Sequence, residues 1–267
     1  MGKLEGRVAI VTGAGRIGNI GQAVCQAFLD EGAAGVVATD LHDAAADELV
    51  ERFGADRFLF LTHDVADEAD WQRVLDATVA RFGGLDILVN NAGISIRGNC
   101  AALSLEDFRK VMDVNLYGVF LGTKICAPEL AKRAPLHPGG SAIVNVSSMS
   151  AYMPTAHSLA YHCSKSAVRM LTMCNSKELG PQGIRVNSIH PGPITTPLLR
   201  EAFKGYAEGG MYADAAEAEA QIAKQTSLGR LCPPEHMAPL FVYLASDDSR
   251  YVTGTAVQHD GGVGSVF

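Results

Sequence analysis

The chain has 267 residues, 48% hydrophobic and 19% charged, which is typical of a globular protein large enough to bury a sizeable core. Its formal net charge is −7 and it has no run rich in Lys and Arg, so nucleic acid and anionic membranes are not expected partners. No apolar stretch has the length of a membrane span or the pattern of a secretory leader, so we expect a cytoplasmic protein.

Seven short segments rich in apolar and β-branched residues predict strands. They are 7–13, 35–40, 57–65, 85–93, 141–148, 184–192 and, more weakly, 255–262. Their apolar character is continuous rather than alternating, as in parallel strands covered on both faces, and helical apolar stripes lie between them. We therefore predict a single α/β domain over 1–267. Its core is a doubly wound, Rossmann-type parallel sheet of about seven strands with helices on both faces.

The first strand runs into the glycine-rich stretch "TGAGRIGNIGQ" (12–22), which fits two phosphate-loop patterns. One is G-x-G-x-x-G, and the other is a stretched T-G-x-x-x-G-x-G. The helical apolar stripe begins only around Ile20 to Ala23, so the stretched pattern fits better. Glycines let backbone N–H groups approach a pyrophosphate at the helix N-terminus. An ordinary glycine-rich turn is the alternative.

Asp40 ends the second predicted strand and indicates which nucleotide is bound. An acidic residue at this point accepts hydrogen bonds from the adenosine ribose and repels a 2′-phosphate, which favours NAD over NADP. Arg16 argues for NADP, because an arginine in the loop is able to bind a 2′-phosphate.

A catalytic group is suggested by "YHCSK", where Tyr161 and Lys165 lie one helical turn apart on the same face. A nearby ammonium favours the phenolate and lowers the pKa of a tyrosine, as a proton donor and acceptor for alcohol chemistry requires. A chance pair on a solvated helix is the alternative. However, Ser148 ends the fifth strand at the ligand-binding edge of the sheet, and Asn115 interrupts a helical pattern.

In combination these residues resemble the short-chain dehydrogenase/reductase family over essentially the whole chain. The motifs that carry the resemblance are the glycine loop, Asp64 in "HDV", "NNAG" (90–93), Asn115, Ser148, Tyr161-x-x-x-Lys165, "PG" (191–192) and "YVTGTAVQHDGG" (251–262). The resemblance implies that Tyr161 is the general acid/base and that Lys165 lowers its pKa and binds the nicotinamide ribose. It also implies that Ser148 polarises the substrate oxygen and that Asn115 holds a water of a proton relay.

The resemblance further implies the residues that hold NAD. They come from the glycine loop, the second, third, fourth and sixth strands, and the catalytic pair: Gly13, Gly15, Arg16, Asn19, Ile20, Gly21, Asp40, Leu41, Asp64, Val65, Asn91, Ala92, Gly93, Tyr161, Lys165, Pro191, Gly192, Ile194 and Thr196. Two positions depart from the family pattern. Asn19 stands where the family has glycine, and because asparagine tolerates left-handed backbone we expect the turn to survive. His259 stands where an apolar residue is usual.

The segment 197–228 follows the break at "PG" and is predicted to be a substrate lid, with an apolar stripe in a short helix. A fixed surface hairpin of helices is the alternative. The side chains expected to meet the substrate, a secondary alcohol such as a polyol or sugar derivative, are Ser148, Ser150, Tyr161, Arg97, His157 and Leu198. Arg97 suits an anionic or hydroxylated substrate, although a solvated surface arginine is the more common situation.

We predict an NAD-dependent oxidoreductase that interconverts a secondary alcohol and its ketone. An NADPH-dependent 3-ketoacyl reductase, a sugar-nucleotide epimerase and a non-catalytic nucleotide-binding protein are the alternatives. The six cysteines are widely spread and no Cys/His pair has ligand spacing, so we expect free thiols and no metal site. Excess apolar residues around 104–131 and 157–180, together with the resemblance, favour a homotetramer.

Overall fold

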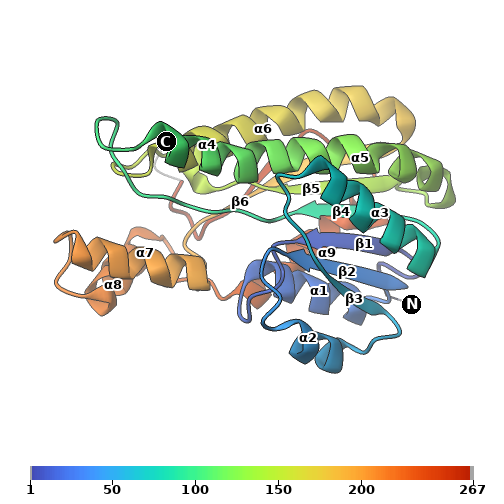
Figure 1. The fold of residues 1–267 in the computed structure, drawn as a ribbon, viewed down its shortest axis with the longest axis horizontal. Coiled ribbons are helices and arrows are strands. Elements are labelled where there is room, and N and C mark those ends of the chain that lie inside the picture. The colour runs from blue at the N-terminus through green and yellow to red at the C-terminus, as the bar shows by residue number, and fades with distance from the viewer. Residues whose placement is uncertain (1, 265–267) are drawn as a thin grey trace.

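A parallel seven-stranded sheet forms the centre of the molecule in the computed structural model, which describes residues 2–264 (Figure 1). The strand order is β3-β2-β1-β4-β5-β6-β7, and every neighbouring pair is parallel. The strands are β1 (Val8–Thr12), β2 (Gly35–Asp40), β3 (Phe58–Thr62), β4 (Ile87–Asn90), β5 (Ser141–Val146), β6 (Ile184–Pro191) and β7 (Ala256–His259). The predicted fold class is confirmed, and the order reverses between β1 and β4, where such sheets bind ligands.

Helices cover both faces of the sheet. They are α1 (Ile20–Asp30), α2 (Ala46–Phe53), α3 (Glu68–Phe82), α4 (Leu105–Met112), α5 (Gly118–Arg133), α6 (Leu159–Leu179), α7 (Pro197–Glu208), α8 (Ala215–Gln225) and α9 (Ala238–Ala245). In Figure 1, α3 to α6 lie above the sheet and α1, α2 and α9 lie below it. Within residues 2–264, no helix combines the length and apolar character needed to cross a bilayer.

The core has two apolar layers, one on each side of the sheet. One joins β1 and β2 to Phe28 of α1, Leu49 of α2 and Phe241 of α9. The other packs Trp71 of α3 and Leu130 of α5 against the opposite faces of β1, β4 and β5. Because side chains alternate between the faces of a strand, a strand buried on both sides is apolar throughout, which is why continuous runs predicted these strands correctly.

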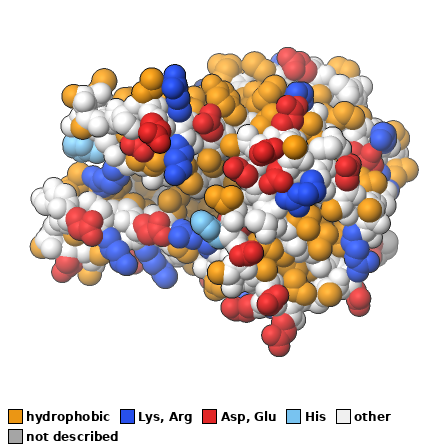
Figure 2. Space-filling view, viewed as in Figure 1, with side chains coloured by type: hydrophobic (Ala, Val, Ile, Leu, Met, Phe, Trp, Pro, Cys, Tyr) orange, Lys and Arg blue, Asp and Glu red, His pale blue; other side chains and the backbone are white. Residues whose placement is uncertain are grey.

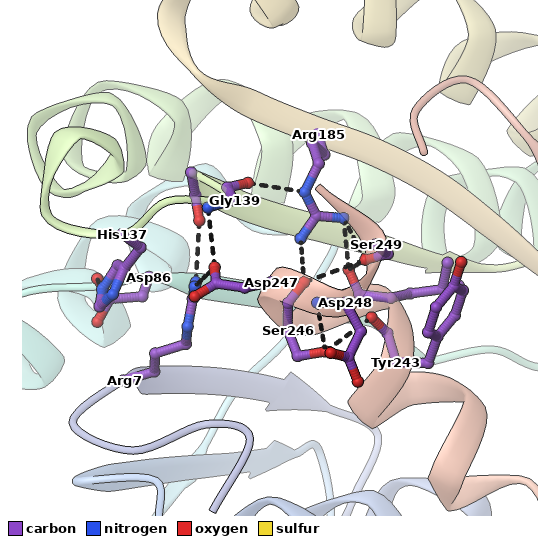
Figure 3. A network of polar contacts seen from close by, with 12 residues as sticks. Arg7, Asp86, His137, Gly139, Arg185, Tyr243, Ser246, Asp247, Asp248 and Ser249 are labelled. Atoms are coloured by element: carbon purple, nitrogen blue, oxygen red, sulfur yellow. Dashed lines mark hydrogen bonds and ion pairs between the residues drawn. The ribbon is translucent and has the colours of Figure 1, made fainter. Parts of the chain in front are cut away.

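A polar network closes the edge of the sheet where the strands begin (Figure 3). Arg7 donates to the Gly140 carbonyl and pairs with Asp247. Arg185 donates to the carbonyls of Gly139, Leu244 and Ser246 and to the Ser249 hydroxyl. These bonds tie β1 and β6 to the segment that follows α9, so this edge is rigid and the opposite edge is left for binding.

The segment predicted as a lid contains α7 and α8, which pack on each other and project from one end of the molecule (Figure 1). In the predicted apolar stripe Phe203 is buried and Leu198, Leu199, Tyr206 and Tyr212 are half-buried, whereas Met211 is exposed. Thr196 caps α7 by accepting a hydrogen bond from the Leu199 N–H. The predicted short helix is therefore present, and the closing movement of a lid stays a prediction.

Candidate active site

The glycine loop between β1 and α1 is the long form predicted from the stretched pattern, since α1 begins only at Ile20. Asn19 does not take up left-handed backbone, since its φ is −96° and its ψ is 172°, so the loop does not use the tolerance on which the expected survival of the turn is based. Gly13 and Gly18 supply the left-handed positions instead. Asn19 is the helix N-cap: its Oδ1 accepts from the Gln22 N–H at 2.8 Å, and its Nδ2 donates to the Gly13 carbonyl at 2.8 Å.

The loop has no room for side chains at the positions that face a dinucleotide. A Cβ on Gly13 would lie 2.7 Å from Ala92 Cα, and one on Gly15 would lie 2.5 Å from the His42 carbonyl. A Cβ on Gly93 would lie 3.3 Å from Lys165 Nζ. The first turn of α1 carries no acidic residue, so its N–H groups and helix dipole favour an anion. These residues fit a pyrophosphate held against bare backbone.

Asp40, at the end of β2, accepts two hydrogen bonds, one of which holds the glycine loop. Its Oδ2 accepts from the Gly15 N–H at 2.9 Å and its Oδ1 from the His42 N–H at 3.2 Å. Arg16 forms an exposed ion pair with Glu201 of α7 at 3.1 Å. The carboxylate of Asp40 is thus fixed beside the glycine backbone, and the guanidinium of Arg16 is directed toward α7.

Thr12 and Asn91 connect the carboxyl ends of β1 and β4, the two strands between which the strand order reverses. The Thr12 hydroxyl accepts from the N–H groups of Asn91 and Ala92, each at 3.0 Å. The Asn91 amide returns hydrogen bonds to the carbonyls of Thr12 and Gly13. Thr12 was not predicted as a site residue, although a hydroxyl directly before the first glycine is a visible signal. These hydrogen bonds hold the predicted Asn91–Ala92–Gly93 stretch beside the glycine loop.

Asn115 interrupts a helix, as its misfit in the helical pattern suggested. It lies in a π-helical turn, Asp113–Tyr117, between α4 and α5. Its side chain is fully buried, accepts from the Ile94 N–H at 2.8 Å and donates to the Ile94 carbonyl at 2.9 Å. It also donates to the Ser164 hydroxyl at 3.0 Å, a partner that the sequence did not reveal. Asn115 therefore joins the β4 loop to the start of the catalytic helix α6.

Tyr161 and Lys165 share one face of α6, with Lys165 Nζ 5.7 Å from the centre of the tyrosine ring. Nζ donates to the Val146 carbonyl at 2.8 Å, and burial lowers the pKa of Lys165 to about 8. Burial raises the pKa of Tyr161, the side chain of Ser148 lowers it, and the charge of Tyr206 raises it. The predicted lowering of the tyrosine pKa is not met here, because burial outweighs the favourable neighbours.

Two histidines support the segment that carries Ser148 and Ser150. His190 Nδ1 is 3.1 Å from the Ser148 carbonyl and Nε2 is 2.9 Å from the Ser188 hydroxyl. His162 Nδ1 is 2.9 Å from the Ser150 carbonyl, and Nε2 accepts from the Thr155 N–H. A carbonyl only accepts, so both Nδ1 atoms are protonated. Both rings therefore act on the backbone behind the catalytic serine, a contact between distant segments that no local motif reveals.

The other predicted site residues lie at or just beyond the carboxyl ends of the strands. Asp64 is exposed and Val65 buried just beyond β3, and Leu41 is exposed beyond β2. His157 is exposed, with φ of 66°, and its carbonyl accepts from the Gly98 N–H. Pro191 ends β6, Gly192 and Ile194 follow it, Thr196 is the N-cap of α7, and Leu198 lies in the first turn of that helix. His259 ends β7 with Nε2 3.5 Å from Cys232 Sγ, which gives the unusual histidine a contact in the loop that follows α8.

Comparison with known proteins agrees with this geometry. A family model described as enoyl-(acyl carrier protein) reductase matches residues 13–264. The NADP-dependent (R)-specific alcohol dehydrogenase of Lentilactobacillus kefiri is 35% identical over 263 residues, 97% of each chain. The 3-beta-hydroxysteroid dehydrogenase of Comamonas testosteroni is 37% identical over 264 residues, 98% of this chain and 97% of its own.

A solved structure also matches: a short-chain type dehydrogenase/reductase from Mycobacterium marinum has a TM-score of 0.86 at 31% identity, covering 98% of this chain and 96% of that chain. These matches run over nearly the full length of the chain. The chain belongs to the short-chain dehydrogenase/reductase family of oxidoreductases.

Proposed function

We propose that this chain interconverts a secondary alcohol and its ketone with NAD, using Tyr161 as the group that moves the proton. One observation carries the proposal: Ser148, Tyr161 and Lys165 meet at the carboxyl edge of the sheet, beside a glycine loop in which Gly13 and Gly15 have no room for a Cβ. A non-catalytic nucleotide-binding protein has no need of a buried lysine next to a half-buried tyrosine, since burying an ammonium is costly.

In the proposed reaction, the bound nicotinamide ring supplies or accepts the hydride. Tyr161 donates its phenolic proton to the ketone oxygen during reduction and takes it back during oxidation. Ser148 donates a hydrogen bond to the same oxygen. Lys165 favours the phenolate through its charge, and Asn115 fixes the loop that faces it. Because burial raises the pKa of Tyr161, the proton-donating form is stabilised when no opposing charge is present.

The choice of NAD is proposed from Asp40. Its carboxylate is fixed at the end of β2 by the N–H groups of Gly15 and His42, where it would repel a 2′-phosphate. Arg16, the residue suited to bind that phosphate, is paired with Glu201. Because the relative from Lentilactobacillus kefiri is NADP-dependent, the choice between NAD and NADP has to be tested by experiment.

The test compares kcat/KM for NAD and NADP in the wild type, Asp40→Ala and Asp40→Asn. Loss of a charged hydrogen bond is worth about 1.5–3 kcal/mol, so the NAD preference of Asp40→Ala should fall at least about tenfold. Asp40→Asn keeps an acceptor for the Gly15 N–H and removes the repulsion, so it should gain NADP activity with less loss of loop stability. An unchanged NAD to NADP ratio in both variants would exclude the assignment.

We propose a ring-containing secondary alcohol as the substrate, with a polyol or sugar derivative as the alternative. The segment next to the site is aromatic, since the rings of Tyr206 and Tyr212 lie 6.3 Å apart and Phe203 of α7 is buried. The relative of Comamonas testosteroni is named for a hydroxysteroid, also a cyclic secondary alcohol. A panel of cyclic alcohols and polyols assayed with each nicotinamide cofactor separates the two classes.

We also propose a homotetramer built on α5 and α6. Phe120 is 48% exposed and Met170 is 55% exposed, whereas Val168 belongs to the core. A groove of about 320 Å³ runs between these helices, lined in part by Phe120, Pro128 and Leu179. Sedimentation at micromolar concentration should give a tetramer, and Met170→Asp should give smaller species. A monomeric wild type would exclude the proposal.

A further inference from the structure

Arg97 lies at the mouth of the site, in the loop between β4 and α4. Its guanidinium carbon is 4.4 Å from the centre of the Tyr206 ring in α7. A Cβ on Gly205 would lie 3.5 Å from Arg97 Cδ, so the side chain runs across α7 at this glycine. The residue is half-buried, unlike the solvated arginine considered from the sequence. Arg97 therefore bridges the β4 loop and the predicted lid.

The charge of Arg97 has no partner in the part of the chain that the structure describes. Nη1 is buried without a hydrogen bond, and no ion pair within residues 2–264 includes Arg97. By contrast, the buried Arg7 and Arg185 at the opposite edge are held by several oxygens each. A guanidinium does not deprotonate, and a buried donor without an acceptor costs free energy. The surrounding structure thus holds a cation that a ligand would stabilise.

The position of Arg97 connects it to the reacting groups. Its loop is anchored at one end by Asn115, which binds Ile94, and at the other by the bond from the Gly98 N–H to the His157 carbonyl. Its stacking partner Tyr206 is close enough to Tyr161 for its charge to raise the pKa of that residue, after the effects of burial and Ser148. Figure 2 shows the surface hollowed between the α7–α8 segment and the body above it, with both basic and acidic side chains around the hollow.

We propose that Arg97 is the subsite for an acid group: the substrate is a secondary alcohol or ketone that carries a carboxylate away from the reacting carbon. The planar fork of the guanidinium matches a carboxylate in a bidentate pair, and the Tyr206 ring supports its flat face. A single guanidinium suits a monoanion better than a phosphate dianion. This inference rests on the proposed function and names the substrate class of that site.

The test uses a matched pair of ketones, 4-oxocyclohexanecarboxylate and its neutral carboxamide. The wild type should reduce the carboxylate with a kcat/KM at least about tenfold above that of the carboxamide, the factor that one charge-assisted hydrogen bond supplies. Arg97→Gln should abolish this preference, and Arg97→Lys should retain part of it. Arg200→Gln removes an exposed charge from α7 and should leave the ratio of the two kcat/KM values unchanged.

A binding measurement separates failure of this inference from failure of the proposed function. Cyclohexanecarboxylate, titrated calorimetrically into the wild type saturated with NAD, should bind at least about tenfold more tightly than into Arg97→Gln. If neither ketone is reduced with NADH or NADPH but this difference remains, the proposed reaction fails and the acid subsite stands. If ketones are reduced with equal kcat/KM, or the carboxylate binds both proteins equally or neither, the acid subsite is wrong.

Discussion

Asn19 joins the cofactor loop to α1 through both ends of its amide, and its removal should affect stability and cofactor binding together. Oδ1 caps the helix at the Gln22 N–H, while Nδ2 holds the Gly13 carbonyl, both at 2.8 Å. Gln22 in turn accepts from the Gly18 N–H at 2.7 Å. The long loop before Ile20 thus depends on a residue that stands where the family pattern has glycine.

The size of the effect follows from these two bonds. Loss of an N-cap costs about 1 kcal/mol and loss of an amide–carbonyl bond about 1 kcal/mol, so Asn19→Ala should lose about 2 kcal/mol. For a chain of this size, that loss lowers Tm by roughly 4–8 °C. Asn19→Asp keeps the cap but loses the donor to Gly13, and its charge lies where we propose the pyrophosphate binds. Its Kd for NAD should rise at least about tenfold, with a smaller loss of Tm than in Asn19→Ala.

Thermal unfolding of the cofactor-free protein and calorimetric titration with NAD measure the two effects separately. Ser104→Ala is the matched control, because Ser104 caps α4 through the Asp107 N–H at 3.0 Å, outside the glycine loop. Loss of this cap alone, about 1 kcal/mol, should lower Tm by roughly 2–4 °C and leave the Kd for NAD unchanged. If Asn19→Ala has the wild-type Tm, or Asn19→Asp binds NAD as tightly as the wild type, the reasoning about this loop is refuted.

Three further predictions concern the chemistry, the acid stability and the lid. Tyr161→Phe should lower kcat by a factor of at least about 100 while NAD still binds by calorimetry, and activity within tenfold of wild type would place the proton donor elsewhere. Burial lowers the pKa of His63 and of His190 from 6.5 to about 4, so only the unfolded chain gains protons between these pH values. At about 1.4 kcal/mol per pKa unit, each histidine contributes about 3 kcal/mol that is lost as the pH falls from 6.5 to 4. Denaturant titrations should show a shallower pH dependence for His63→Asn and His190→Asn than for the wild type or the exposed-site control His42→Asn. Amide exchange in 197–212 should be faster than in the central strands and should slow when NAD and substrate bind; equal protection before binding would argue against a lid.

The sequence predicted all seven strands, and most of its boundary errors fall at their carboxyl ends. The predicted strands 57–65 and 85–93 stop at Thr62 and Asn90 in the structure. The residues beyond these ends, such as Val65 and Ala92, are apolar or small enough to extend the pattern, but they belong to the loops of the site. At an edge that binds a ligand, the strand ends before the apolar run in the sequence ends. Periodicity alone does not show at which residue the strand stops.

The candidate site was predicted where its chemistry is local in sequence. Tyr161 and Lys165 are one turn apart, and the misfit of Asn115 marked a real break in the helix. Contacts between distant segments were not predictable, because they depend on the packing of whole elements. The Arg97–Tyr206 stacking and the support of Ser148 by His190 are of this kind. Burial likewise reversed the expected direction of the Tyr161 pKa, since desolvation depends on everything that covers the ring.

Buried charged groups have several hydrogen-bond partners at the amino edge of the sheet and few at the carboxyl edge. At the amino edge, Asp86 accepts from Arg133, from the Val8 N–H and from His137, so a buried carboxylate has several partners. At the carboxyl edge, Lys165 has one carbonyl and burial lowers its pKa to about 8, while Arg97 has a buried nitrogen without a partner. Charges that lack partners destabilise the folded chain, and such costs persist where they serve binding or catalysis. The well-paired amino edge offsets that cost, and we propose that the cations of the carboxyl edge meet a cofactor and an acidic substrate.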